Sequence, residues 1–229
     1  SMATPVLDII QHIRERQDQS LYQDLHWEGS FQDYLEMVQE TPQIARNAFQ
    51  RMYDMIVSFG TRKYTEYKKE IIHYHFFDDP IGGGRDAIFG LDIPLMKFVQ
   101  VLKAAAMGYG PERRVLLLHG PVGSAKSTIC RLLKKGLEHY SRTPEGALYS
   151  FSWVGEGLAA LGVPPEMAPP TSAMDVMPCP MHEEPLHLIP QEYRGAFLDQ
   201  INQKLADDRR ISVEGDLCPA CRHVFNQLM

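Results

Sequence analysis

The chain has little of what membrane, nucleic-acid-binding or disulfide-bonded proteins need. Its longest apolar runs, such as 115–118, are far too short to cross a bilayer, and its N-terminus lacks a basic segment followed by an apolar one. Basic residues are not in excess: the net charge is −6, whereas a general nucleic-acid surface needs clustered Lys and Arg. We therefore expect a cytoplasmic protein with neither a membrane nor a nucleic acid as partner.

Cysteine is also scarce, with four residues in two short clusters, which is typical of metal or redox use in a reducing compartment. Hydrophobic residues make up 44% and charged residues 23% of the 229 residues, so the composition indicates a globular protein of one to two domains. We read Ser1-Met2 as the remnant of an expression tag. The pattern divides the rest into an N-terminal helical segment (1–60), an α/β core (61–154) and a proline-rich insertion with a helix and a cysteine knuckle (155–229).

Apolar residues spaced three and four apart predict helices. Two or three are expected between 6 and 59, where Ser30 and Asp33 resemble a capping box and Thr41-Pro42 resembles an N-cap followed by proline. A loop is expected at 78–84, which contains three consecutive glycines. Further helices are expected at 91–107, 126–139 and 191–205.

Two segments read as strands. Residues 115–119 form a continuous apolar run between Pro111 and Gly120, as expected for a buried central strand of a parallel sheet. Residues 147–153 look like a second strand, so the order strand, helix, strand predicts an α/β fold. Prolines are dense from 155 to 190, and we expect no regular core element there.

A phosphate-binding loop follows the first predicted strand. Its residues match the pattern G-x-x-x-x-G-K-[ST] except at one position, and they are Gly120, Pro121, Val122, Gly123, Ser124, Ala125, Lys126 and Ser127. Small residues let the backbone turn its N–H groups inward, and the positive end of the next helix adds its dipole. We expect Lys126 to reach the β and γ phosphates of ATP, Ser127 to bind Mg²⁺ and Thr128 to lie near the α phosphate. The alternative is a glycine-rich turn without a ligand.

Two features limit what this loop is expected to do. Ala125 stands where a second glycine is usual, and we expect it to avoid the left-handed conformation, which is strained for alanine. Hydrolysis also needs an acidic residue at the end of an apolar strand, and none follows. Glu183-Glu184 lies among prolines and reads as a pair of exposed carboxylates. We therefore expect ATP binding without efficient turnover, no catalytic residue in this chain, and a natural polypeptide that continues beyond Met229.

The cysteines suggest a structural zinc site. Cys179 and His182 form one pair, Cys218 and Cys221 form another, and four such ligands suit tetrahedral Zn²⁺ without leaving a position for substrate. His187 or His223 could replace His182 as the fourth ligand. Free thiols or a Cys218–Cys221 redox pair are the alternatives. The other histidines, including His73 and His75, are expected in satisfied or exposed positions.

Several stretches together resemble one family: FGLD at 89–92, GPVGSAKS at 120–127, LYSFSW at 148–153 and CPMHEEPLHLIP at 179–190. The chain from about 45 to 229 is similar to the PrkA family, described as bacterial serine protein kinases with an AAA+-like ATPase region in front and a kinase-like region behind. The resemblance implies a P-loop NTPase fold of AAA+ type, with Ile88, Phe89 and Gly90 near the adenine. Ala125 departs from the glycine common in the family loop, and the acidic ATPase motif and the kinase-like region are absent.

The first reading is thus the ATP-binding portion of a PrkA-type serine protein kinase that carries a structural zinc. A second is a non-catalytic docking module for a partner protein, stabilised by nucleotide and zinc. A third, a small-metabolite kinase, would need a lid and a base that the sequence does not offer. The protein substrate is unknown, and a homo-oligomer is one expectation for the full-length protein because AAA+ relatives often form rings.

Overall fold

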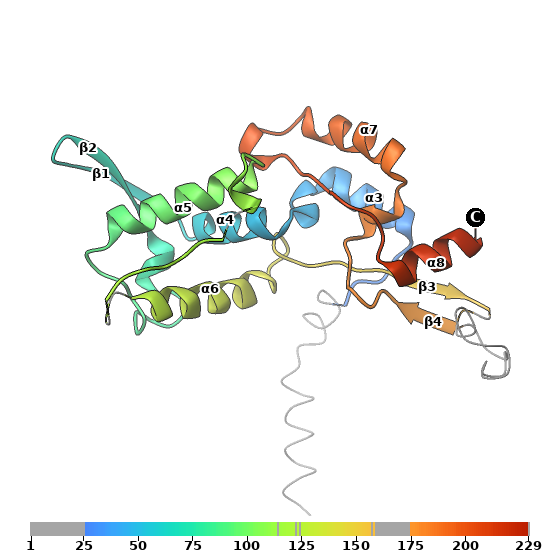
Figure 1. The fold of residues 1–229 in the computed structure, drawn as a ribbon, viewed down its shortest axis with the longest axis horizontal. Helices are drawn as coiled ribbons and strands as arrows, with labels where there is room; N and C mark the ends of the chain where they lie inside the picture. The colour runs from blue at the N-terminus through green and yellow to red at the C-terminus, as the bar shows by residue number, and fades with distance from the viewer. Residues whose placement is uncertain are drawn as a thin grey trace, which may run out of the picture.

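The computed structural model describes residues 26–113, 115–121, 123, 125–156, 158 and 175–228 (Figure 1). Its helices are α3 (Phe31–Glu40), α4 (Ala48–Ser58), α5 (Asp92–Ala106), α6 (Lys126–Tyr140), α7 (Gln191–Asn202) and α8 (Pro219–Leu228). Its strands are β1 (Thr61–Glu66), β2 (Lys69–Tyr74), β3 (Ser152–Gly155) and β4 (Asp175–Pro178). Short 3₁₀ helices are η1 (Pro42–Ala45), η2 (His75–Asp78), η3 (Pro111–Arg113), η6 (Pro185–Leu188) and η7 (Asp207–Arg209). Predicted helical turns before residue 26 lie outside the described residues.

The first described helices are started by their caps. Ser30 and Asp33 form the predicted capping box of α3, in which each side chain bonds the other residue's backbone N–H. Thr41 is the N-cap residue of η1 and Pro42 is its first residue, as predicted, but the Thr41 side chain makes no cap hydrogen bond and the element is a 3₁₀ helix. Asn47 caps α4 instead, again in a capping box. A proline at the first position therefore helped one short turn to form but did not start an α-helix.

The helices expected at 91–107, 126–139 and 191–205 are confirmed as α5, α6 and α7 with small shifts at their ends. The C-terminal helix α8 was not predicted. It has only ten residues, and it begins at Pro219, between Cys218 and Cys221. The sequence analysis had interpreted this segment as a metal-binding knuckle. Among the described residues, no helix combines the length and the apolar character that a bilayer crossing would require.

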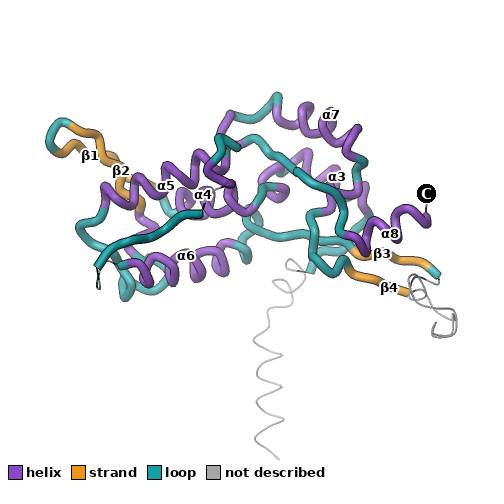
Figure 2. The backbone as a smooth tube through the Cα atoms, viewed as in Figure 1, coloured by secondary structure: helices purple, strands orange, loops and turns teal. Residues whose placement is uncertain are grey.

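The strands of the described residues pair in two antiparallel hairpins and not in a parallel sheet (Figure 2). In the β1–β2 hairpin, Thr61 faces Tyr74 and Glu66 faces Lys69. Its two-residue turn, Tyr67-Lys68, has φ values of 47° and 62°. Left-handed turn positions usually hold Gly or Asn, so this hairpin carried no turn signal that the sequence could reveal.

The buried strand expected at 115–119 is wrong for this structure. These residues form no strand, and Val115 and Leu117 are 94% and 81% exposed. A central strand becomes buried only when neighbouring strands flank it. Neither two-stranded sheet of the described residues pairs with this segment, so Val115 and Leu117 lack the flanking strands that would cover them.

The second expected strand is also corrected. Only its last two residues, 152 and 153, belong to β3, and β3 pairs antiparallel with β4. Because β4 lies at 175–178, the proline-dense segment contains a regular strand after all. The protein is thus a mixture of helices and small sheets, and a parallel core is not observed among the described residues.

Three apolar clusters organise these elements, and each draws on distant parts of the chain. The first packs α4, η2, α5 and α6 together through buried side chains that include Met55, Ile56, Phe76, Val99 and Leu132. The second joins α3 and η1 to η6 and α7 through Tyr34, Val38, Leu186, Leu198 and Ile201. The third surrounds Cys179, Leu217, Cys218 and Cys221. In Figure 1, α4, α5 and α6 lie on the left and α3, α7, α8 and β3–β4 on the right.

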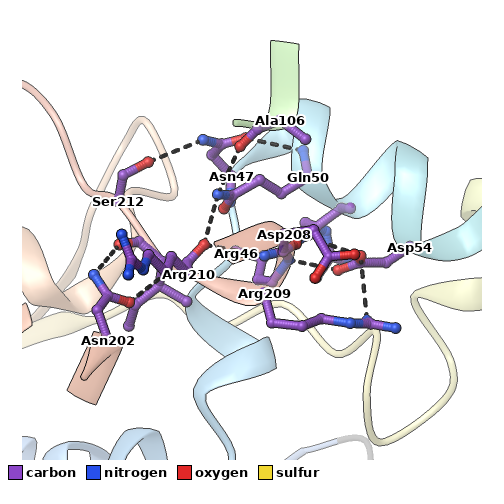
Figure 3. A network of polar contacts seen from close by, with 12 residues as sticks. Arg46, Asn47, Gln50, Asp54, Ala106, Asn202, Asp208, Arg209, Arg210 and Ser212 are labelled. Carbon is purple, nitrogen blue, oxygen red and sulfur yellow. Dashed lines mark hydrogen bonds and ion pairs between the residues drawn. The ribbon is translucent and has the colours of Figure 1, made fainter. Parts of the chain in front are cut away.

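A polar network connects the segment around η7 to α4 and to the end of α5 (Figure 3). The Arg46 guanidinium binds the Asp54 carboxylate and also donates to the carbonyls of Asp208 and Arg210, at 3.0 Å each. Gln50 Nε2 donates to the carbonyls of Ala106 and Arg210, at 3.0 and 2.8 Å. These side chains thus hydrogen-bond backbone carbonyls in the segments that they join.

Candidate nucleotide site and cysteine centre

The phosphate-loop sequence leads into the N-terminus of α6. Lys126 is the first residue of the helix, and Ala125 is its N-cap with φ 59° and ψ 9°. Ala125 therefore adopts the left-handed conformation that we expected it to avoid. The Ile129 N–H donates to the Ala125 carbonyl at 2.8 Å, so the helix hydrogen bonds begin at this strained residue. Gly123, with φ 85°, also needs the left-handed region, which only glycine enters without cost.

Lys126 is held by its own loop. Its Nζ donates to the Gly120 carbonyl at 2.6 Å and to the Pro121 carbonyl at 2.7 Å. The ammonium group of Lys126 is thereby held within the turn, next to the N-terminus of α6. Ser127 is exposed, and the Thr128 hydroxyl accepts a hydrogen bond from Arg131 at 3.3 Å.

A cavity of about 680 Å³ lies between this loop and a second segment far away in the sequence. One wall holds Gly123, Ala125, Lys126, Ser127 and Thr128, and the other holds Ala87, Ile88, Phe89 and Leu91. The structure thus brings together two segments whose residues were proposed for ATP binding. Gly90, Gly120 and Pro121 are not part of the lining, whereas Ala87 and Leu91 were not predicted. Val122 and Ser124 lie outside the described residues.

The loop that carries Ile88 and Phe89 is fastened to α6 by ion pairs. Asp79 is 1% exposed, and its carboxylate accepts the Lys135 ammonium at 2.7 Å and the backbone N–H groups of Gly82 and Asp86 at 3.0 Å each. Burial alone would raise the pKa of Asp79, but these donors lower it below its usual value. Arg131 binds Asp86 at 2.8 Å. The sequence analysis missed these residues, although two basic residues four apart on α6 were a usable signal.

The cysteines meet in a second site. Ligand atoms of Cys179, Glu183, Cys218 and Cys221 all lie within 4.8 Å of one another, and the three sulfurs belong to buried residues. The Glu183 carboxylate accepts the Cys218 N–H at 3.0 Å and the Cys179 thiol at 3.4 Å. The predicted spacing of the cysteines therefore corresponds to a real cluster.

The fourth member of this cluster is Glu183 and not a histidine. His182 is exposed with φ 49°, and it lies outside the group. The ring nitrogens of His187 lie 2.9 Å from the Glu184 carbonyl and 3.1 Å from the Glu214 carbonyl, and His223 is exposed on α8. A left-handed turn at His182 directs the next side chain inward, and spacing alone could not reveal this.

The reading of Glu183-Glu184 as exposed carboxylates is also corrected. Both residues are half-buried, and Glu184 accepts the Tyr34 hydroxyl at 2.5 Å and the Leu186 N–H at 2.8 Å. Burial raises the pKa of Glu184 to about 7 in spite of these donors. Glu184 therefore joins α3 to the segment that carries the cysteine cluster.

The donor set around the cysteines fits a thiophilic ion. Burial raises the pKa of the Cys221 thiol to about 12, so without an ion this thiol keeps its proton at neutral pH. Two backbone N–H groups, those of Glu183 and Cys221, point at the sulfurs of Cys179 and Cys218 at 3.4 Å each. The Trp153 Nε1 is buried without a conventional acceptor, and its interaction with Cys221 lowers the pKa of that thiol. Donors of this kind stabilise thiolates, which are the form that binds metal.

A G-x-x-x-x-x-K-S loop at a helix N-terminus, with a cavity opening beside it, is the arrangement typical of a phosphate-loop domain. A family model described as the PrkA AAA domain matches residues 29–228. The chain belongs to this family, which implies a P-loop NTPase fold of the AAA type.

Two relatives are similar to the chain. A Bacillus subtilis (strain 168) protein named "ATP-dependent protease PrkA" is 34% identical over 214 residues, which are 93% of this chain and 27% of the relative. A Geobacillus stearothermophilus protein named "Uncharacterized protein in gldA 5'region" is 34% identical over 94 residues, which are 41% of this chain and 84% of the relative. The chain thus spans about a quarter of the length of the Bacillus relative. No solved structure matches it.

Proposed function

We propose that this chain is the ATP-binding portion of a larger ATP-dependent enzyme and that it takes Mg-ATP into the cavity beside the N-terminus of α6. The observation that carries this proposal is the cavity itself, which has the phosphate-loop residues on one wall and Ile88 and Phe89 on the other. Membership of an AAA family supports nucleotide as the ligand.

Each part of ATP has a partner in this arrangement. The N-terminus of α6 attracts phosphate through its dipole and through the N–H groups of its first turn. Lys126 leaves the carbonyls of Gly120 and Pro121 and bonds the β and γ phosphates, exchanging two neutral acceptors for anionic ones. Ser127 holds Mg²⁺ and Thr128 lies by the α phosphate, while the apolar Ile88 and Phe89 cover the adenine.

Binding in this chain is proposed to occur without efficient turnover. None of the residues that line the cavity in the described structure is acidic, so none can polarise water or hold Mg²⁺ as a carboxylate. The acidic residues that flank the lining stretch are engaged elsewhere: Asp86 pairs with Arg131, and Asp92 bonds Tyr64 and His73. Two activities are candidates for the parent enzyme. The Bacillus relative is named a protease, whereas the family resemblance implies serine phosphorylation.

In the parent enzyme, we propose that residues 115–118 become a strand of the parallel sheet that an AAA domain implies. The segment is apolar, largely exposed, in neither a helix nor a strand, and placed directly before the phosphate loop. Strands supplied by the rest of the protein would bury these side chains. A cytoplasmic location and assembly of parent subunits into a ring are parts of the same proposal.

The cysteine centre is proposed to hold one structural zinc, with Cys179, Cys218 and Cys221 as ligands and a Glu183 oxygen in the fourth position. Three thiolates favour zinc over hard ions such as Mg²⁺. The ion would link Cys179, which follows β4, to Cys218 and Cys221 at the start of α8. A reduced thiol cluster or a Cys218–Cys221 disulfide is the competing interpretation, and metal analysis separates them.

The nucleotide proposal is tested by calorimetric titration of Mg-ATP into the wild-type chain and into Lys126→Ala. We expect the variant to bind at least about ten-fold more weakly, since a hydrogen bond to a charged group contributes roughly 1.5–3 kcal/mol. Lys134→Ala is the matched control, because Lys134 is an exposed lysine on the same helix away from the cavity. Equal affinity of the wild type and Lys126→Ala would contradict the proposal.

A further inference from the structure

A second cluster of potential metal ligands lies where β2 meets η2. Asp78 Oδ2 is 2.9 Å from His73 Nε2 and 3.1 Å from His75 Nδ1, so two imidazoles point at one carboxylate oxygen. The ligand atoms of the three residues all lie within 4.8 Å of one another. Ligands around a tetrahedral ion with bonds of about 2.1 Å are themselves about 3.4 Å apart, so only small movements would admit an ion.

The second ring nitrogen of His73 is hydrogen-bonded to a carboxylate, as is usual for metal-bound histidines. His73 Nδ1 lies 3.0 Å from Asp92 Oδ1, and the other oxygen of Asp92 accepts the Tyr64 hydroxyl at 2.7 Å. A histidine that binds metal through Nε2 must carry its proton on Nδ1, and a carboxylate that accepts this proton orients the ring. Asp92 occupies this position, and Tyr64 holds Asp92 in place.

The surroundings leave the cluster accessible to an ion. The side chains of His75 and Asp78 are 44% and 40% exposed, whereas His73 and Asp92 are only 14% and 21% exposed. The supporting residues are thus the more buried ones, and the outer ligands face solvent. Two imidazoles and one carboxylate suit zinc, cobalt or nickel better than the hard Mg²⁺ and Ca²⁺, and three protein ligands leave positions for water.

We propose that His73, His75 and Asp78 bind a divalent transition metal ion, with Asp92 as the positioning residue for His73. This site is separate from the cysteine centre, which lies in another apolar cluster of the molecule. Its residues stand at both ends of the loop 79–91, because Asp78 precedes this loop and Asp92 follows it. A bound ion would therefore join β2, η2 and the first turn of α5, which frame the segment that lines the cavity.

The test is a calorimetric titration of Ni²⁺ into the purified full chain without nucleotide. We expect one binding event that is at least about ten-fold weaker in His75→Ala and in Asp78→Asn, and about ten-fold weaker in Asp92→Asn. His139→Ala is the histidine control, since His139 is exposed on α6, and Cys221→Ser reports the cysteine centre. His139→Ala and Cys221→Ser should both leave the affinity of this Ni²⁺ binding event unchanged. Thermal unfolding gives a second readout, because Ni²⁺ should raise the Tm of the wild type and not of His75→Ala.

Three outcomes would overturn the proposal. They are the absence of any event, an event that survives in both His75→Ala and Asp78→Asn, and an event that Cys221→Ser removes while His75→Ala retains it. The ligand variants change exposed side chains, so their folding can be checked by their Tm without metal. This test does not involve ATP, and its result is independent of the nucleotide proposal.

Discussion

Arg46 and Asp54 form a bidentate ion pair in which both side chains are almost completely buried. Arg46 Nε lies 2.5 Å from Asp54 Oδ2, Arg46 Nη2 donates to Asp54 Oδ1 at 2.9 Å, and the side chains are 1% and 4% exposed. Burial raises the pKa of Asp54, and the neighbouring Arg46 opposes this effect. The pair anchors the network that joins α4 to the segment around η7 (Figure 3).

Removing one partner of this pair should be costly. Asp54→Ala leaves a buried guanidinium without its carboxylate, and we expect the free energy of unfolding to fall by about 3 kcal/mol. Urea denaturation measures the change. Asp207→Ala is the matched control, since Asp207 pairs with Arg210 on the surface and its loss should cost at most about 1 kcal/mol. Equal effects of the two changes would show that burial does not determine the strength of the Arg46–Asp54 pair.

Ala125→Gly should stabilise the chain. Alanine in the left-handed region costs roughly 1 kcal/mol that glycine does not. We expect the variant to unfold at higher urea concentration and to bind Mg-ATP at least as well as the wild type. Ala104→Gly, inside α5, is the opposite control, because there glycine should destabilise by about 1 kcal/mol. A loss of stability in Ala125→Gly would mean that the left-handed conformation at this position is not strained.

Two glycines inside helices should respond to alanine with opposite signs. A Cβ on Gly136 in α6 would lie 2.6 Å from Phe76 Cε2 and 2.7 Å from Met55 Sδ, so Gly136→Ala should destabilise by about 1–3 kcal/mol through overpacking. A Cβ on Gly195 in α7 meets no atom within 4 Å, and Gly195→Ala should stabilise by up to about 1 kcal/mol. Thermal unfolding of both variants checks the pair. A stabilising Gly136→Ala would contradict the packing of α6 on η2.

The purified chain should contain one zinc per molecule, as measured by elemental analysis. Cys221→Ser should lose most of this zinc, and Cys130→Ser, which changes an exposed cysteine on α6, should retain it. Glu183→Gln should weaken zinc binding more than His182→Ala, because only Glu183 lies in the cluster. Chelation should lower the Tm of the wild type. A metal-free protein with a Cys218–Cys221 disulfide in mass spectrometry would refute the zinc assignment and favour the redox interpretation.

Local patterns predicted much of the helical structure. The capping box marked the start of α3, and hydrophobic periodicity predicted α5, α6 and α7; both signals act over a few residues. The β1–β2 hairpin escaped prediction because its turn, Tyr67-Lys68, holds neither glycine nor asparagine. Residues 115–119 were predicted as a buried strand, but their burial depends on neighbours that local patterns cannot supply.

The sequence by itself singled out the phosphate-loop residues and the paired cysteines as candidate binding residues, because both patterns are encoded in short spacings. Only the tertiary structure decided which other residues lie close to the phosphate loop and to the cysteines. It placed Ile88 and Phe89 across the cavity from Lys126 and put Glu183, not His182, among the cysteines. It also brought His73 and His75 to Asp78, with Asp92 bonded to the other nitrogen of His73. Backbone dihedrals and packing between distant segments set these directions, and neither is contained in the spacing of residues along the chain.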